Sequence, residues 1–150
     1  MAAARTFILT GSPENYAATR DHGFSVIGFK ERRRNQAMEV QREDRIVFYL
    51  TRVAAFGGSV RVTGDLFEER TRIWPGKPGN VDAYPWRLPT EPELVLPEAE
   101  WVPAEELKDE LEWVAKWPPE HWRLAFQGQV RGVCEHDAQL LMARMGAVAA

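Results

Sequence analysis

The residues with the clearest chemical potential in this sequence form a run of cations in its first third. Six basic side chains fall within 16 positions: Lys30, Arg32, Arg33, Arg34, Arg42 and Arg45. The whole chain carries 19 Lys and Arg against 22 Asp and Glu, so any contact with nucleic acid has to come from a local patch. The patch has two interpretations, a solvated loop or an edge that contacts phosphate. The residue types leave both open.

Other residue types form no catalytic or metal-binding pattern. The three histidines, His22, His121 and His136, lack metal-ligand spacing, and the single Cys134 excludes an internal disulfide. No glycine-rich phosphate loop and no glycine-flanked serine nucleophile is present. The carboxylate-rich stretch Glu98–Glu112 is typical of a solvated face. We therefore predict no catalytic residues, no metal and no cofactor.

Length and composition favour one domain with a packed core. The chain has 150 residues, of which 45% are hydrophobic, so we expect a single domain over 1–150. The first apolar run, Phe7–Leu9, is too short for an export signal or a membrane span. One cysteine suits a reducing compartment, so we expect a cytoplasmic protein that does not bind membranes.

Short strands, with helices at both ends, must position the cations. We predict strands at Arg5–Thr10, Phe24–Phe29, Arg45–Arg52, Ala54–Thr63, Asp65–Ile73, Tyr84–Leu88 and Leu94–Leu96. Pro89 and Pro92 should keep the last two short, and Gly57-Gly58 indicates a bulge or a close backbone approach. Expected helices span Pro13–Asp21 (with Ser12 as its cap), Asn35–Val40, Pro103–Ala115 and His136–Met145, the last ending at Gly146. The pattern indicates an α+β fold with a curled, mostly antiparallel sheet.

The order of short landmarks resembles a known family. FILTGSPENYAATRDHG is followed by VIGF, then by RNQAMEVQREDRIVFY, AFGGSVRVTG and finally YPWR. This order looks like that of EVE domains, in particular their small stand-alone prokaryotic members, and it covers the chain from about Arg5 to Met145. EVE domains are related to YTH and ASCH domains within the PUA-like superfamily.

The resemblance implies a PUA-like fold, a curled sheet or pseudo-barrel flanked by helices. It also implies a non-enzymatic module that binds DNA or RNA and accepts one base, modified for example by methylation, in a pocket. Taking a base out of its stack costs a few kcal/mol, and stacking on an aromatic side chain returns about 1–3 kcal/mol. A base methyl in an apolar slot adds only about 1 kcal/mol. Shape and polar contacts therefore have to supply most of the discrimination.

The same resemblance implies a set of site residues. The polar turn after the first strand matches the one that supplies hydrogen bonds to the base in relatives, and it comprises Thr10, Gly11, Ser12 and Asn15. The wall matches Ile27 and Gly28, where YTH domains and some EVE relatives carry a cage tryptophan, and Phe29 is a possible substitute ring. Trp74 is the expected stacking platform, Tyr49 and Leu50 are expected floor residues, and phosphate contacts are expected from Lys30, Arg32, Arg33, Arg34 and Arg87. Ser12 as a helix cap, core packing of Tyr49 and Leu50, and a purely structural role of Arg87 are competing interpretations.

Two other functions stay open. One is a binding protein for a small molecule or nucleotide metabolite that uses the same pocket. The other is an ASCH-like nucleoside-processing enzyme, which would need a lysine or carboxylates in the pocket, although only Lys30 and Lys77 precede residue 100. We expect a monomer or weak homo-oligomer. If nucleic acid binds on the side of the arginines, the acidic stretch Glu98–Glu112 should point away from it.

Overall fold

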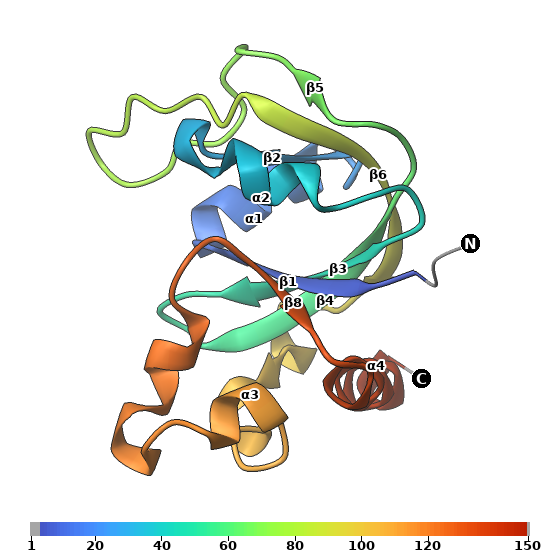
Figure 1. Ribbon diagram of the computed structural model, residues 1–150, viewed down its shortest axis with the longest axis vertical. Helices are drawn as coiled ribbons and strands as arrows, with labels where there is room; N and C mark the ends of the chain where they lie inside the picture. The colour runs from blue at the N-terminus through green and yellow to red at the C-terminus, as the bar shows by residue number, and fades with distance from the viewer. Residues whose placement is uncertain (1–3, 150) are drawn as a thin grey trace.

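The computed structural model describes residues 4–149. Its central element is an eight-stranded curled sheet (Figure 1). The strands are β1 (Thr6–Gly11), β2 (Val26–Phe29), β3 (Arg45–Leu50), β4 (Ala55–Val62), β5 (Phe67–Glu68), β6 (Trp86–Val95), β7 (Val102–Pro103) and β8 (Val130–Val133). Their main order is β2-β6-β4-β3-β1-β8, with β5 on β6 and β7 on β4. Among the strand pairs of residues 4–149, only β1 with β3 is parallel. The α+β class and the mostly antiparallel curled sheet are therefore confirmed.

Strands β1 and β3 are buried on both faces, which explains the apolar runs FIL and IVFYL within them. Alternate side chains go to opposite sides of the sheet. Ile8 and Val47 join one core cluster, whereas Leu9 and Phe48 join the other. The sheet thus separates two hydrophobic cores, and each core needs its own cover of helices.

One face is covered by α1 (Pro13–Asp21), the 3₁₀ turn η1 (Glu31–Arg33) and α2 (Arg34–Met38) (Figure 1). Helix α1 starts as the sequence predicts, because the Ser12 hydroxyl oxygen accepts from the Asn15 N–H at 3.1 Å and Pro13 occupies the first turn. The Tyr16 hydroxyl donates to the Gly57 carbonyl at 3.1 Å and ties this helix to β4. The beginning of α1 is thereby fixed at the end of β1.

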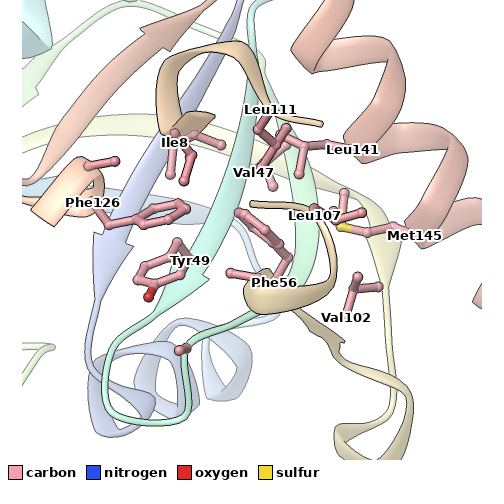
Figure 2. Close-up of a cluster of buried hydrophobic side chains, with 14 of the residues drawn as sticks. Ile8, Val47, Tyr49, Phe56, Val102, Leu107, Leu111, Phe126, Leu141 and Met145 are labelled. Atoms are coloured by element: carbon pink, nitrogen blue, oxygen red, sulfur yellow. The ribbon is translucent and has the colours of Figure 1, made fainter. Parts of the chain in front are cut away.

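The opposite face is covered by α3 (Glu112–Ala115), α4 (Glu135–Ala149) and the 3₁₀ segments η2 (Glu98–Glu100), η3 (Ala104–Glu106) and η4 (Pro119–Phe126). Figure 2 shows this core, in which the Tyr49 and Phe126 rings stack with centroids 4.0 Å apart. Leu141 and Met145 of α4 are fully buried in the same cluster. Within residues 4–149, no helix has the length and apolarity needed to cross a membrane.

The glycine pair of β4 confirms one prediction. The pairing of β3 with β4 shifts register between Phe48 and Tyr49, opposite Gly57 and Gly58. A Cβ on Gly58 would lie 2.3 Å from the Leu94 carbonyl oxygen of the neighbouring strand β6. A close backbone approach therefore requires glycine there.

The two short strands predicted around Pro89 and Pro92 were wrong, because β6 runs through both prolines. Pro89 stands where β6 changes partner from β2 to β4, and Pro92 stands next to a register shift in β4. A missing N–H disturbs little at such irregular positions.

Three further expectations differ from the structure, and one strand was not predicted. Of the predicted strand Asp65–Ile73 only the two-residue β5 forms, and β8 was missed because its sequence VRGV is short and half exposed. The predicted helix over Pro103–Ala115 is instead a 3₁₀ turn, a bend and the short α3, because the Asp137 carboxylate accepts from the Glu112 and Trp113 N–H groups and starts a separate helix there. Helix α4 continues past Gly146, which therefore does not end it.

Candidate functional site

Two adjoining cavities lie where β1 ends and α1 begins. The outer one, called the mouth, has a volume of about 240 Å³, and the inner cavity has a volume of about 40 Å³. Their six shared lining residues are Thr10, Gly11, Ser12, Asn15, Tyr84 and Gln129. The whole predicted polar turn therefore lines both cavities, together with two residues that the sequence did not single out.

The inner cavity is walled by apolar and aromatic side chains, which include Leu9, Tyr16, Ile27, Phe48, Leu50, Trp74 and Tyr84. The Trp74 indole N–H donates to Thr19 Oγ1 at 2.8 Å, which fixes the ring. A Cβ on Gly28 would lie 2.4 Å from this ring, so the tryptophan packs against bare β2 backbone. The predicted wall residues Ile27 and Gly28 and the predicted platform Trp74 therefore come together here.

The polar turn is held by its own contacts. The Asn15 amide oxygen accepts from the Gly76 N–H at 2.8 Å, and its amide nitrogen donates to the Tyr84 hydroxyl at 3.2 Å. Ser12 is the α1 cap and also a lining residue, so its structural interpretation holds beside its place in the cavity. As a cap the Ser12 oxygen accepts, which leaves the hydroxyl hydrogen for a ligand. The positive end of α1 adds to the attraction for an anion.

Gln129 closes the seam between the two edges of the curled sheet. Its amide oxygen accepts from the Lys30 N–H at 3.0 Å, and its amide nitrogen donates to the Gly28 carbonyl at 3.2 Å. Its own carbonyl accepts from the Thr10 N–H at 2.7 Å. One residue thus joins β1 to β2, which no strand ladder connects in the described sheet. No local pattern marks this role, because its partners are about 100 positions away.

Tyr84, the other lining residue missed by sequence reasoning, has a strained backbone. Its φ is +51°, which is uncommon for a bulky side chain. The Tyr84 N–H donates to Asp82 Oδ1 at 2.9 Å, and the Tyr84 carbonyl accepts from Arg87 Nε at 3.1 Å. Its ring lies 5.9 Å from that of Trp74 at an interplanar angle of 72°. The strained backbone therefore places a second aromatic ring at the cavity. The sequence Tyr-Pro-Trp at 84–86 is the signal from which this ring could have been predicted.

Four cations surround the mouth: Lys30, Arg32, Arg33 and Lys77. None of them has a carboxylate within ion-pair distance in the part of the chain that the structure describes. Burial lowers the pKa of Lys30, and its three cationic neighbours lower it further. No Asp or Glu is among the described lining residues of either cavity. Such mutually repelling cations favour an anionic ligand.

Two predicted phosphate contacts lie elsewhere. Arg34 stacks over the Trp86 ring at 4.9 Å and lines a separate groove. Arg87 is 2% exposed, and its guanidinium donates to the carbonyls of Thr71, Ala83 and Tyr84. Burial lowers the pKa of Arg87, whose guanidinium also lies 5.1 Å from the Trp74 ring. Arg87 therefore holds the loop that carries Trp74 and Tyr84, and it does not reach the mouth.

Other residues of the cationic run and two predicted pocket residues also serve the scaffold. Arg42 pairs with Asp65 and Arg45 pairs with Glu93, so neither is a free cation. Phe29 is fully buried in the core under α1 and α2. Tyr49 points to the opposite face, against Phe126 (Figure 2), because successive strand residues alternate. Its neighbour Leu50 does line the inner cavity.

The acidic stretch lies across the sheet from α1 and α2. Figure 1 shows the segment from η2 to α3 beside α4, on the face away from the loop at 75–83. Leu107, Leu111 and Val114 anchor the stretch in the core of that face. The expected separation is therefore present for these two groups: the four cations of the mouth and the carboxylates of the stretch 98–112 lie on opposite faces.

No protein-family model and no curated protein sequence matches this chain. Solved structures do match it over nearly its whole length. The YTH domain of the Zygosaccharomyces rouxii MRB1 protein, in complex with N6-methyladenosine RNA, has a TM-score of 0.66 at 14% identity, covering 95% of this chain and 87% of that one.

Two further structures agree. The Toxoplasma CPSF4-YTH domain in apo form has a TM-score of 0.67 at 17% identity, covering 98% of this chain and 88% of that one. Human THYN1, in complex with DNA containing 5-methylcytosine, has a TM-score of 0.61 at 9% identity, covering 93% and 96%. At these identities the likeness concerns the fold. The chain therefore has the PUA-like fold that the YTH domains and THYN1 share.

Proposed function

We propose that this chain is an EVE-type PUA-like domain that binds nucleic acid and holds one unstacked base at its paired cavities, without catalysing a reaction. The observation that supports the proposal is that two cavities with chemically different linings adjoin each other. Trp74, Tyr84 and Ile27 offer rings and an apolar slot, and the adjoining mouth offers Lys30 and three other unpaired cations. A nucleotide has the same division into a flat base and a charged phosphate.

Energetics support one bound base with phosphate contacts on either side of it. Unstacking costs a few kcal/mol, so stacking on Trp74 and Tyr84 has to be supplemented by phosphate contacts. Ile27 stands where some EVE and YTH relatives have a tryptophan, so fewer aromatic side chains would contact the base in this cavity. A methyl group on the base would fill the small inner cavity and favour the modified base by about 1 kcal/mol. We propose such a modified base as the preferred ligand.

The test is a fluorescence titration with labelled single-stranded DNA and RNA that contain one 5-methylcytosine, one N6-methyladenine or no modification. Binding should strengthen as salt falls, because phosphate contacts release counterions. One modified oligonucleotide should bind several-fold more tightly than its unmodified match. Equal binding of a free nucleoside with no salt dependence would instead indicate a metabolite-binding protein, and conversion of the nucleoside would indicate an enzyme.

A pair of tryptophan variants locates the site. Trp74→Ala removes a wall of the inner cavity and should weaken modified-base binding about tenfold, given the usual worth of aromatic stacking. Trp122→Ala, on the opposite face beside Phe126, serves as the matched control and should leave binding unchanged. Circular dichroism verifies that both variants are folded. Unchanged binding by folded Trp74→Ala would contradict the pocket assignment.

A further inference from the structure

Four side chains with metal-binding atoms converge at the junction of β8, α3 and α4, on the face opposite the base cavity. They are Glu112, Cys134, His136 and Asp137, and one donor atom from each lies within 4.8 Å of all the others. Sequence spacing did not reveal the group, because Glu112 precedes Cys134 by 22 positions. The fold brings the beginning of α3 against the beginning of α4.

The individual distances are close to those of a coordination sphere. Cys134 Sγ lies 3.3 Å from Glu112 Oε2, and His136 Nδ1 lies 3.7 Å from Glu112 Oε1 and 2.9 Å from Asp137 Oδ1. With bonds of about 2.0–2.3 Å, the ligands of a tetrahedral zinc ion are separated from each other by roughly 3.3–3.8 Å. Small rotations of these side chains therefore suffice to surround an ion.

The group is anchored at its base and open at its surface. Asp137 is 1% exposed, and its Oδ1 accepts from the Glu112 N–H at 2.8 Å while Oδ2 accepts from the Trp113 N–H at 3.3 Å. Glu112, Cys134 and His136 are exposed to solvent. A metal ion can enter from the surface and meet one ligand that the fold already holds in place.

The charges also favour a cation. No Lys or Arg lies within ion-pair distance of Glu112 or Asp137 among residues 4–149, and the basic group that contacts both carboxylates there is the His136 imidazole. Two carboxylates beside a thiol form an electronegative cluster without a permanent counter-charge. A divalent ion would compensate both.

We propose that Glu112, Cys134, His136 and Asp137 bind one zinc ion. A mixed set of sulfur, imidazole and carboxylate ligands suits zinc better than magnesium or calcium, which prefer oxygen ligands only. On binding, the Cys134 thiol loses its proton to solvent and a thiolate–zinc bond forms. The ion would link α3 to the first turn of α4, and so stabilise the cover of the core shown in Figure 2.

The first experiment titrates untagged, chelator-treated protein with Co²⁺, in the presence of a phosphine reductant, and then with Zn²⁺. One Co²⁺ per chain should produce a thiolate-to-cobalt charge-transfer absorption band, and Zn²⁺ should abolish the band by displacement. A half-equivalent of metal per chain, accompanied by dimerisation in size-exclusion chromatography, would overturn the single-chain site. No binding at all would overturn it as well.

Exposed positions provide variants that should still fold. Cys134→Ser should remove the charge-transfer band, and His136→Asn should weaken binding at least about tenfold. His121→Asn and Glu135→Gln, which alter exposed residues outside the group, should bind like the wild type. Zn²⁺ should raise the melting temperature of the wild type and of these controls but not of Cys134→Ser. Equal affinity in Cys134→Ser would show that the metal binds elsewhere. Because the site is separate from the base cavity, these outcomes do not depend on nucleic-acid binding.

Discussion

At the scale of single residues, the candidate site depends on close packing as much as on polar groups. Trp74 reaches the inner cavity only because Gly28 has no side chain. Tyr84 reaches it through a strained backbone that Asp82 and Arg87 hold. The wall of the cavity is therefore sensitive to small changes in volume.

Gly28→Ala should displace Trp74, because the added Cβ would lie 2.4 Å from its ring. Overpacking of this kind costs about 1–3 kcal/mol of unfolding free energy. We expect a lower urea midpoint and at least a severalfold loss of base binding. Gly132→Ala is the control, since its Cβ would meet only Phe7 at an ordinary 3.5 Å. Wild-type stability and binding in Gly28→Ala would contradict the assigned packing.

The arginines of the segment ERRR differ in role although they are neighbours in sequence. Arg32→Ala and Arg33→Ala should each weaken oligonucleotide binding and reduce the slope of log K against log salt by about 0.7 for a single strand. Arg34→Ala removes the same charge from a residue that stacks on Trp86, and should leave the slope unchanged. Titrations at four salt concentrations measure the slopes. Identical slopes for all three variants would mean that the mouth makes no specific phosphate contact.

At the scale of elements, an ion network holds β3, β4 and β6 together away from the cavity. The Glu93 carboxylate accepts from Arg45 at 2.6 Å, from Ser59 at 2.8 Å and from Arg61 at 2.6 Å. Burial raises the pKa of Glu93, but these hydrogen bonds outweigh the effect and hold the pKa at about 2. The network therefore links acidity to the stability of the sheet.

Glu93 should make the protein acid-sensitive. Its pKa is lower in the folded than in the unfolded state, so the stabilisation is complete above about pH 4.5 and is lost as the pH falls toward 2. Glu93→Gln should lower the unfolding free energy at pH 7 by on the order of 2–3 kcal/mol and flatten its decline between pH 5 and pH 2. Glu91→Gln, an exposed residue of the same strand, is the control. Urea unfolding at several pH values between 5 and 2 measures this decline. If the unfolding free energy of Glu93→Gln fell with pH as steeply as that of the wild type, the assignment would be wrong.

At the scale of the whole molecule, the sheet separates two cores and two kinds of surface. Four cations without an ion pair lie around the mouth, and the carboxylates of the stretch 98–112 lie on the α3–α4 face. Nucleic acid should therefore approach from one side. The negative charge of the far side should change the rate at which nucleic acid associates only weakly at physiological salt, where the screening length is about 8 Å.

Neutralising the acidic face tests this orientation. Glu105→Gln with Glu110→Gln removes two exposed negative charges and should change the affinity for a single-stranded oligonucleotide less than about twofold at 0.15 M salt. The salt slope should stay as in the wild type, since no phosphate contact is added or lost. A steeper slope in this double variant would place nucleic acid on the acidic face.

Sequence by itself determined the elements whose signals are local. The unbroken apolar runs of β1 and β3, the Ser12-Pro13 start of α1, the Gly57-Gly58 irregularity and the buried stripe of Leu107 and Leu111 all follow from neighbouring residues. The α+β class and the curled sheet follow from the order of those elements. The resemblance to EVE domains then pointed to the polar turn, Ile27, Gly28 and Trp74, which the fold does gather at one cavity.

Only the tertiary structure decided which side chains of similar type share a site. Arg33 and Arg34 are adjacent, yet one lines the mouth and the other lies in a different groove. Tyr49 and Leu50 point to opposite faces of the sheet, because successive side chains of a strand alternate. Gln129, Lys77 and the group around Cys134 join partners that are distant in sequence. Such juxtapositions depend on how strands pair and on which face each residue occupies, and these are long-range properties that no local pattern records.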